Sequence, residues 1–208
     1  MCGVSDLGEP LREQDVDRDP VRQFAGWFEQ AETAGVRLPE AATLATASAA
    51  GAPSARMVLV KQFDERGFVF FSNYESRKGT EISDNPRAAL VFYWDLLGRQ
   101  VRIEGPVVHT SAEETAAYVR SRPRGSQLSA LASPQSQTID ARQTLEQRVA
   151  ELEELYGEDE LPLPSNWGGF RLFPETIELW QQRDDRLHDR LRYRRRYDAG
   201  WVIERLAP

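Results

Sequence analysis

Short apolar segments joined by tight-turn residues restrict the fold of this chain more than any other feature. Residues 56–63 (RMVLVKQF) and 68–72 (FVFFS) flank the turn 64–67 (DERG), and the pattern recurs over residues 88–108. Strands joined by such short turns must run antiparallel. We expect about seven strands in consecutive hairpins, with helices between them. This favours an antiparallel, closed or nearly closed β-barrel with peripheral helices, a mainly β (α+β) fold, over a doubly wound parallel sheet.

Helix signals interrupt these strands. Asp19-Pro20 is a typical N-cap with proline in the first turn, and the apolar spacing predicts a helix to about residue 35. Ser111 with Glu114 forms a capping box for another helix. The loop after that helix, residues 122–136, is rich in turn formers. The remaining expected elements are helices at 75–84 and 138–156 and strands at 42–47, 170–173, 176–181, 187–193 and 201–205.

Composition excludes several classes of protein. The 208 residues carry a net charge of −7, which disfavours a general nucleic-acid binder. One cysteine and two histidines rule out an internal disulfide and leave little for a metal centre, so no metal is expected. No apolar run is long enough to span a membrane, and the N-terminus does not read as a secretory signal, so we expect a cytoplasmic protein. Residues 1–18 are expected to be a flexible arm and residues 19–208 a single domain.

No phosphate loop rich in glycine, metalloprotease helix or nucleophile elbow is present, so the candidate chemistry lies in cationic groups. Arg77-Lys78 occupy a helix start, where positive charge is unfavourable unless an anion binds there; a solvated basic turn is the alternative. Arg56 and Lys61 have opposite parity on one strand, so they share a face only if that strand twists or bulges.

Two further clusters are rich in arginine. Residues 122–127 (RPRGSQ) place guanidinium and hydroxyl donors in one loop, and seven arginines crowd into residues 183–196. In an acidic chain the second cluster suggests a local anion site. Arg186, His188 and Arg190 share parity, so on a strand they would face the same way. A chain with phosphate-compatible groups and no protein nucleophile would take its chemistry from a cofactor.

Motifs distributed in order from about residue 19 to the C-terminus resemble the pyridoxamine 5'-phosphate oxidase family. The motifs are RMVLVK (56–61), SRKG (76–79), RQV (99–101), SRPRGSQ (121–127), SPQS (133–136), WGGF (167–170), WQ (180–181), RLHDR (186–190) and ERLAP (204–208). The resemblance implies a homodimer of split β-barrels with FMN at the subunit interface. It also implies oxidation of pyridoxamine or pyridoxine 5'-phosphate to pyridoxal 5'-phosphate by hydride transfer to flavin, with O2 giving H2O2.

The same resemblance assigns site residues. FMN is expected to contact Arg56, Met57, Val58, Leu59, Val60, Lys61, Phe71, Ser72, Arg77, Lys78, Gln100, Gln135, Ser136, Trp180 and Arg190. The substrate is expected to bind Lys61, Tyr118, Arg122, Ser126, Arg186 and His188, the last two as catalytic residues over its pyridine ring.

Two alternatives stay open. Many family members carry an Arg-x-x-Tyr pair in the N-terminal arm, but this arm has no tyrosine before Tyr74. Leu38 and Gln182-Arg183 also depart from the family pattern. A related flavin oxidase acting on another ring system, such as a phenazine precursor, is therefore the first alternative. A non-enzymatic binder of FMN or pyridoxal phosphate is the second.

Overall fold

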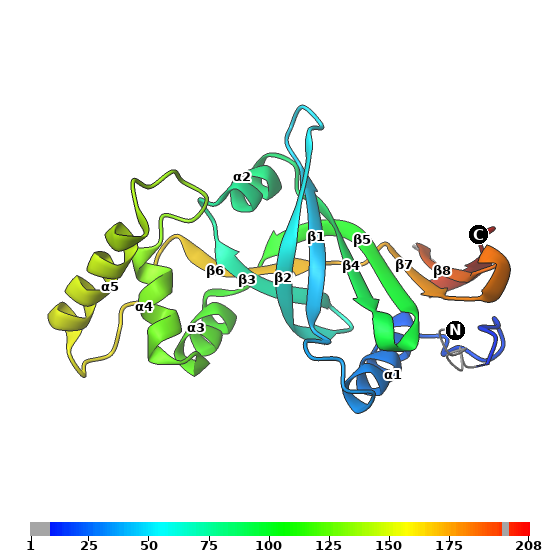
Figure 1. Cartoon of the computed structure of the whole chain (residues 1–208). Helices are drawn as coiled ribbons and strands as arrows, with labels where there is room; N and C mark the ends of the chain where they lie inside the picture. The colour runs from blue at the N-terminus through cyan, green and yellow to red at the C-terminus, as the bar shows by residue number, and fades with distance from the viewer. Residues whose placement is uncertain (1–8, 197–199) are drawn as a thin grey trace.

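The computed structural model describes residues 9–196 and 200–208 and contains nine strands and five α-helices within these ranges (Figure 1). The strands are β1 (Ala41–Ala47), β2 (Pro53–Asp64), β3 (Gly67–Asn73), β4 (Arg87–Trp94), β5 (Arg99–His109), β6 (Trp167–Leu172), β7 (Thr176–Gln181), β8 (Asp189–Arg196) and β9 (Gly200–Arg205). The helices are α1 (Pro20–Thr33), α2 (Arg77–Asp84), α3 (Ala112–Ser121), α4 (Arg124–Ala132) and α5 (Arg142–Tyr156).

Six of these strands close into a barrel. Their order is β4-β1-β2-β3-β6-β5, and pairing of β4 with β5 completes the ring. Strands β7, β8 and β9 extend the sheet outward from β5. All nine pairings in the described residues are antiparallel, which confirms the expected barrel. The structure has more strands than the seven expected. The strands are also not all paired as consecutive hairpins, because β1–β4, β3–β6 and β5–β7 join strands that are distant in sequence.

Strand β5 belongs to both halves of the barrel. Residues up to 106 pair with β4, and residues 107–109 pair with β6. Just before the change of partner, a Cβ at Gly105 would lie 1.8 Å from the carbonyl oxygen of Phe173. Only glycine allows this close approach of the two backbones.

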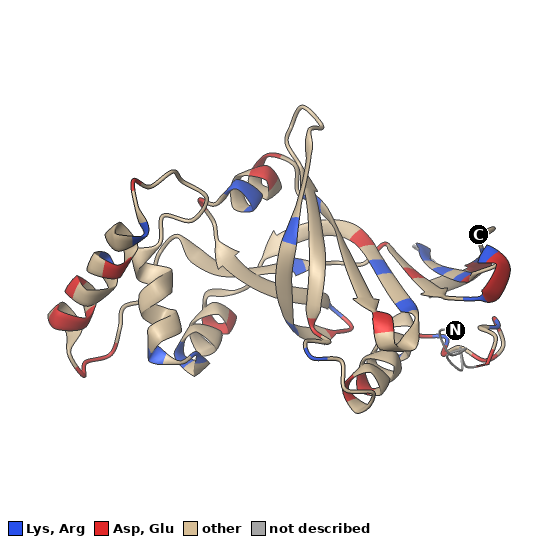
Figure 2. Cartoon of the chain, in the orientation of Figure 1, with Lys and Arg blue, Asp and Glu red and all other residues tan. Residues whose placement is uncertain are grey.

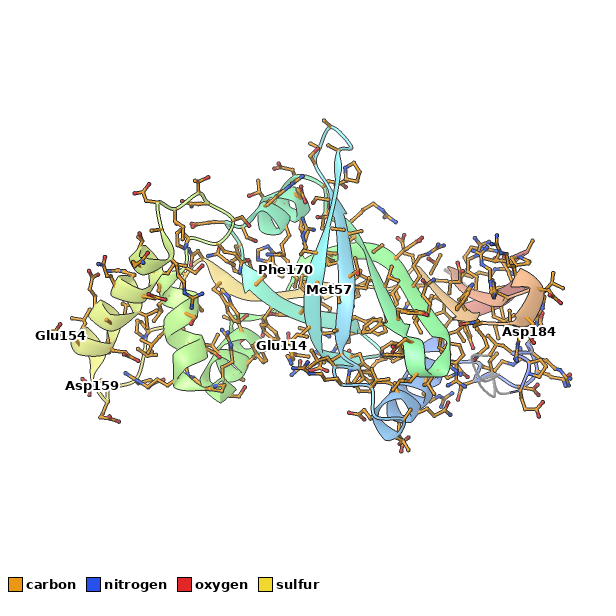
Figure 3. All side chains as sticks on the ribbon, in the orientation of Figure 1. Met57, Glu114, Glu154, Asp159, Phe170 and Asp184 are labelled. Carbon is orange, nitrogen blue, oxygen red and sulfur yellow. The ribbon has the colours of Figure 1, made fainter. Side chains whose placement is uncertain are left out.

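Aromatic and aliphatic side chains fill the barrel. Phe24 of α1 is fully buried at its end, with ring centroids 5.0 Å from those of both Phe68 and Phe92. Phe170 lies inside on β6, all six residues of which are buried (Figure 3). Helix α1 begins as expected, because Asp19 accepts a hydrogen bond from the Val21 N–H and Pro20 occupies the first turn.

Helices α4 and α5 form a second, smaller core beside the barrel. It is made by Leu128 and Ala132 of α4, Leu152 of α5 and Leu161 of the following segment. The prediction of a loop across residues 122–136 was wrong, because residues 124–132 are helical. Glycine and serine lower the intrinsic helix propensity there, and burial of Leu128 outweighs it. The expected capping box of α3 is present.

The expected flexible arm is described only from residue 9; residues 1–8 lie outside the described residues. Leu11 and Val16 are buried and belong to the main core cluster. Residues 9–18 therefore pack against the domain instead of extending from it. Within the described ranges, none of the helices has the length and apolar character needed to cross a membrane.

Candidate functional site

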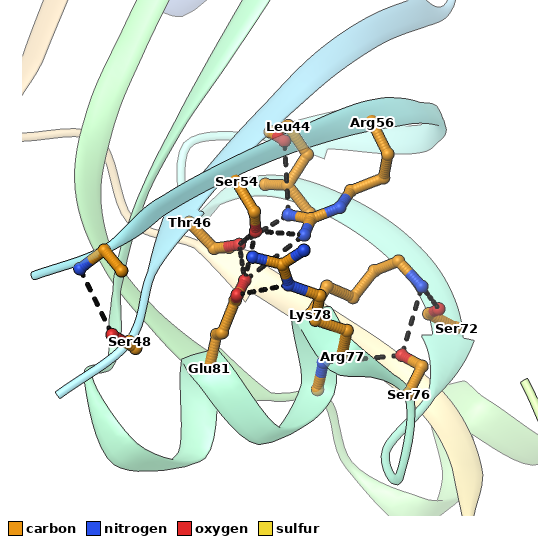
Figure 4. A network of polar contacts seen from close by, with 12 residues as sticks. Leu44, Thr46, Ser48, Ser54, Arg56, Ser72, Ser76, Arg77, Lys78 and Glu81 are labelled. Carbon is orange, nitrogen blue, oxygen red and sulfur yellow. Dashed lines mark hydrogen bonds and ion pairs between the residues drawn. The ribbon is translucent and has the colours of Figure 1, made fainter. Parts of the chain in front are cut away.

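Lys78 lies in the first turn of α2, and its Nζ is bonded to neutral oxygens of the described residues (Figure 4). Its Nζ lies 2.9 Å from Ser72 Oγ, 3.1 Å from Ser76 Oγ and 2.6 Å from Gln135 Oε1. Burial lowers the pKa of Lys78 to about 8, with a smaller contribution from Arg56. A half-buried cation at a helix N-terminus, with no carboxylate partner among the described residues, is suited to an anion.

Glu81, on the same helix, binds two of the predicted cofactor residues. Its Oε2 lies 3.2 Å from Arg56 Nη2, and its Oε1 accepts from Arg77 Nε at 2.9 Å. Burial alone would raise the pKa of Glu81, but hydrogen bonds from Ser54, Thr46 and the two arginines lower it to about 2. Glu81 was not among the residues predicted from the sequence; its i,i+4 spacing from Arg77 was the available signal.

Strand β2 contains a bulge, one of the two irregularities that would allow Arg56 and Lys61 to share a face. The β2–β3 register shifts between Val60 and Gln62, so Lys61 is the extra residue. Lys61 forms an ion pair with Glu40 at 3.2 Å, whereas Arg56 faces Glu81. Met57 is 62% exposed and points away from the barrel interior (Figure 3). Strand β2 therefore presents both a cationic and an apolar surface.

Three aromatic rings stack between β3, α3 and β6. The Phe71 and Tyr118 centroids lie 3.7 Å apart with an interplanar angle of 13°, and Tyr118 is nearly parallel to Trp167 at 6.1 Å. The guanidinium carbon of Arg122 lies 4.6 Å from the Trp167 ring centroid. This stack holds the end of α3, and with it Arg122, against the barrel.

Arg122 has a buried Nη1 with no hydrogen-bond partner within the described part of the chain. Burial also lowers the pKa of this guanidinium. A cavity of about 210 Å³ lies beside it, lined by Asn73, Arg122, Ser129, Ala130, Ser133, Gln135 and Trp167. A buried donor without an acceptor is costly, and the cavity beside Arg122 could hold a ligand that supplies one. Gln135 lines this cavity and also bonds Lys78, so the two cationic centres are neighbours.

Two other predicted residues, Ser126 and Ser136, follow Arg122 in the sequence. Ser126 is half-buried in the first turn of α4 and does not line the cavity. Ser136 is exposed and has a φ of 73°, an uncommon conformation for a residue other than glycine.

A second set of predicted residues occupies β5, β7 and β8. Gln100 pairs with Trp180, and Trp180 pairs with Arg190, so the three lie in one row across the sheet. Directly paired residues project from the same face. The His188 ring lies 4.6 Å from the Trp180 ring, centroid to centroid.

Arg186 and His188 do not share a strand face, so that prediction was wrong. Strand β8 begins only at Asp189, and Arg186 ends a short 3₁₀ turn, Asp184–Arg186. Asp185 and Arg186 have φ values of 54° and 62°, which breaks the extended backbone on which strand parity depends. Arg186 is exposed.

The arginine-rich segment 183–196 is largely neutralised by carboxylates. Glu178 binds Arg190, Glu204 binds both Arg192 and Arg194, and Asp189 binds Arg183. Figure 2 shows basic and acidic residues interleaved at this end of the molecule. The number of arginines in this segment therefore overstates the positive charge available to a local anion site.

The residues near Lys78 and Arg122 are far from those of the β7–β8 region within one chain. Strands β7 and β8 lie at one end of the molecule and α3 and α4 at the other (Figure 1). Likewise, Asp184 in the β7–β8 loop and Glu114 in α3 lie on opposite sides of β1 and β2 (Figure 3). A single chain therefore does not bring Arg186 and His188 to the cavity at Arg122.

The chain matches two family models and is similar to known proteins over its whole length. Residues 28–156 match a family model described as pyridoxamine 5'-phosphate oxidase. Residues 167–208 match the pyridoxine 5'-phosphate oxidase C-terminal dimerisation region. The chain is 55% identical to a pyridoxine/pyridoxamine 5'-phosphate oxidase of Salinibacter ruber over 100% of both chains. It is 57% identical to the corresponding Paraburkholderia phymatum protein, covering 93% of this chain and 91% of that one.

Solved structures show the same fold. PhzG from Burkholderia lata, in complex with tetrahydrophenazine-1-carboxylic acid, has a TM-score of 0.90 and 33% identity, covering 96% of this chain and 98% of that one. An FMN-binding protein related to pyridoxamine 5'-phosphate oxidase, from Nostoc punctiforme, has a TM-score of 0.71 at 19% identity, covering 91% and 98%. From its matched family models and its full-length relatives, the chain belongs to the pyridoxamine 5'-phosphate oxidase family of split-barrel flavoprotein oxidoreductases.

Proposed function

We propose that this chain is an FMN-dependent oxidase that converts pyridoxamine 5'-phosphate and pyridoxine 5'-phosphate to pyridoxal 5'-phosphate. The observation that carries the proposal is Arg122, whose buried Nη1 has no partner in the described residues and whose side chain lines a cavity adjoining the Lys78 cluster. Two neighbouring cationic centres match two phosphates, one on the cofactor and one on the substrate. The alcohol and O2 would yield the aldehyde and H2O2; the amine would also consume water and release ammonia.

The residues around α2 fit an FMN phosphate. Lys78 lacks a carboxylate partner in the described ranges, and Arg56 and Arg77 are oriented by the buried Glu81. Ser72 and Gln135 supply further polar groups next to Lys78. When bound, FMN would accept the hydride from C4' of the substrate and pass the electrons to O2. The chain itself needs only to position the two rings and neutralise their phosphates.

Arg122 would bind the substrate phosphate, with Tyr118, Ser126 and Lys61 beside it. Tyr118 is fixed by stacking on Phe71. Lys61 would exchange its partner Glu40 for the phosphate, because their ion pair is partly exposed to solvent. Desolvation around Arg122 strengthens its attraction for an anion.

A second copy of the chain would complete each site. Gln100, Trp180, Arg186, His188 and Arg190 lie at the other end of the barrel from Arg122. In a homodimer with two-fold symmetry, the β7–β8 end of one subunit can cover the α2–α4 side of its partner. The match of residues 167–208 to a dimerisation region supports this arrangement. His188 and Arg186 would then cover the pyridine ring as the catalytic residues.

Anaerobic titration of the FMN-loaded protein with pyridoxamine 5'-phosphate tests the proposal. We expect the flavin absorbance to bleach, to return on admission of air, and one equivalent of pyridoxal 5'-phosphate to form. A protein that binds FMN but stays oxidised would contradict the proposed substrate. A protein that binds pyridoxal phosphate or FMN without producing H2O2 would be a carrier.

The similarity to PhzG supports a second candidate, oxidation of a reduced phenazine precursor. The same titration with tetrahydrophenazine-1-carboxylic acid separates the two. Faster flavin reduction by this compound than by pyridoxamine 5'-phosphate would favour the second candidate. The complete SRPRGSQ motif at residues 121–127, in which Arg122 lines the cavity, favours the phosphorylated substrate.

A further inference from the structure

Residues 9–17 form a segment that we call the N-terminal strap, and it lies against β8 and β9. Leu11 and Val16 anchor it, with 9% and 8% of their surfaces exposed. At its end, the Tyr193 hydroxyl of β8 donates to the carbonyl oxygen of Asp17 at 2.7 Å. The strap is therefore fixed at several points along its length, next to the loop that carries Arg186 and His188.

Asp189, the first residue of β8, joins three parts of the chain. Its Oδ2 accepts from Arg183 Nε at 2.8 Å and from the backbone N–H of Leu11 at 3.1 Å. Its Oδ1 accepts from Arg205 Nη1 at 2.9 Å. Only 16% of the Asp189 side chain is exposed. Burial would raise the pKa of Asp189, but these donors outweigh it and lower the pKa, so the carboxylate is charged.

The two arginines at Asp189 also bind the strap. Arg205 Nη2 donates to the carbonyl oxygen of Leu11 at 2.7 Å, and Arg205 Nε lies 2.9 Å from Glu13 Oε1. Arg183 donates to the carbonyl oxygen of Glu9. The carboxylate and the strap thus bind the same two cations, and loosening one loosens the other.

The loop held in this way has an unfavourable backbone. Asp185 and Arg186 both adopt positive φ values, 54° and 62°. Residues other than glycine persist in this region only where the surrounding structure holds them. The Arg183 N–H donates to His188 Nδ1 at 3.1 Å. Nδ1 is then an acceptor, so neutral His188 carries its proton on Nε2.

We infer that Asp189, together with the N-terminal strap, is a positioning residue that fixes the orientation and tautomer of His188 and the conformation of Arg186. The role in turnover rests on the proposed function, whereas the effect on the His188 ring does not. Asp189 acts through Arg183: its carboxylate holds the Arg183 side chain, and the Arg183 backbone holds the imidazole. The strap binds both arginines, through the carbonyl oxygens of Glu9 and Leu11.

The test compares Asp189→Asn with Asp184→Asn in the FMN-loaded full chain. Asparagine keeps the size of Asp189 and removes its charge, and Asp184 is an exposed carboxylate of the same loop. The first readout is the long-range ¹H–¹⁵N spectrum of the imidazoles. The chain has only two histidines, so a His109→Gln variant assigns the His188 signals. The second readout is KM against kcat for pyridoxamine 5'-phosphate.

We expect wild type and Asp184→Asn to show His188 as a single Nε2–H tautomer, and Asp189→Asn to show averaging of the two nitrogens. Asp189→Asn should raise KM about tenfold and change the Kd for FMN less than threefold. An Asp189→Asn protein with the His188 spectrum and the KM of Asp184→Asn would overturn the inference.

Arg205→Met, with Arg194→Met as its control, provides the same comparison if Asp189→Asn does not fold. Arg205 is bonded to the strap and Asp189, whereas Arg194 is bonded to Glu204. Arg205→Met should shift the His188 spectrum in the same direction, and an unchanged spectrum would count against the strap. If wild type does not oxidise the substrate, the proposed function fails, while the His188 spectra still decide this inference.

Discussion

Glu81 Oε2 lies 3.2 Å from Arg56 Nη2, and 9% of the Glu81 side chain is exposed. Thr46 and Ser54 donate to the same carboxylate, and Arg56 in turn donates to both of their hydroxyl oxygens. The guanidinium is therefore held in one orientation by β1, β2 and α2 without a ligand. Such preorganisation reduces the entropy lost when an anion binds.

Replacement of Glu81 by glutamine should weaken FMN binding about tenfold, close to the 1.4 kcal/mol that separates tenfold affinities. The physical reason is that Arg56 and Arg77 lose the charge that orients them. Titration of the apoprotein by quenching of flavin fluorescence measures the Kd. Asp84→Asn, an exposed change at the end of the same helix, is the control and should leave the Kd unchanged. Equal affinities for the two variants would contradict the role of Glu81.

FMN affinity should fall as pH rises through about 8, because Lys78 of the apoprotein loses its proton there. A phosphate monoester is a dianion above about pH 6, so the loss of attraction arises from the lysine. Below pH 8 the lysine is charged and the affinity should be constant. Measurement of Kd from pH 6.5 to 9.5 for wild type and Lys78→Gln checks this. The variant should bind weakly at every pH, and a parallel decline in both proteins would assign the effect to another group.

Replacement of Arg122 by methionine should lower kcat/KM for pyridoxamine 5'-phosphate about 10- to 100-fold, the range of a lost charge-assisted hydrogen bond. The change should be mainly in KM, and FMN affinity should not alter. Arg120→Met is the matched control, because Arg120 is an exposed arginine two residues earlier, paired with exposed Glu160. Steady-state kinetics give kcat and KM of both variants for pyridoxamine 5'-phosphate. A loss of FMN binding in Arg122→Met would place the residue at the cofactor instead.

Gly105→Ala should destabilise the fold by several kcal/mol or prevent folding, because its Cβ would lie 1.8 Å from the Phe173 carbonyl oxygen. Gly26→Ala is the contrasting change. Nothing lies within 4 Å of a Cβ at Gly26, which is in the middle of α1, so alanine should stabilise the protein by roughly 0.5–1 kcal/mol. Urea unfolding of wild type and the two variants gives the change in the free energy of unfolding for each substitution. A Gly105→Ala protein as stable as wild type would show that the close approach to the Phe173 backbone does not require glycine.

Local sequence patterns predicted most elements of the fold. Alternating apolar residues and short turns identified the hairpins of the barrel, and cap residues identified the starts of α1 and α3. These signals depend on neighbours within a few residues, so they are readable without the tertiary structure. Helix α4 was missed because its residues favour a turn locally, and only packing of Leu128 against the α5 region stabilises the helix.

Residue patterns along the chain are enough to predict the antiparallel barrel, the family motifs and a set of cationic residues suited to phosphates. The partner of each cation follows from the fold: Glu81 orients Arg56, Glu178 binds Arg190, and Arg122 keeps a buried donor without a partner among the described residues. The fold also places Arg186 and His188 in a strained loop at the opposite end of the barrel from Arg122. The alternation of side chains along a strand does not apply to Arg186, because the backbone at Asp185 and Arg186 is not extended. Ion pairing is a property of distances in space, which residue spacing along a chain does not specify.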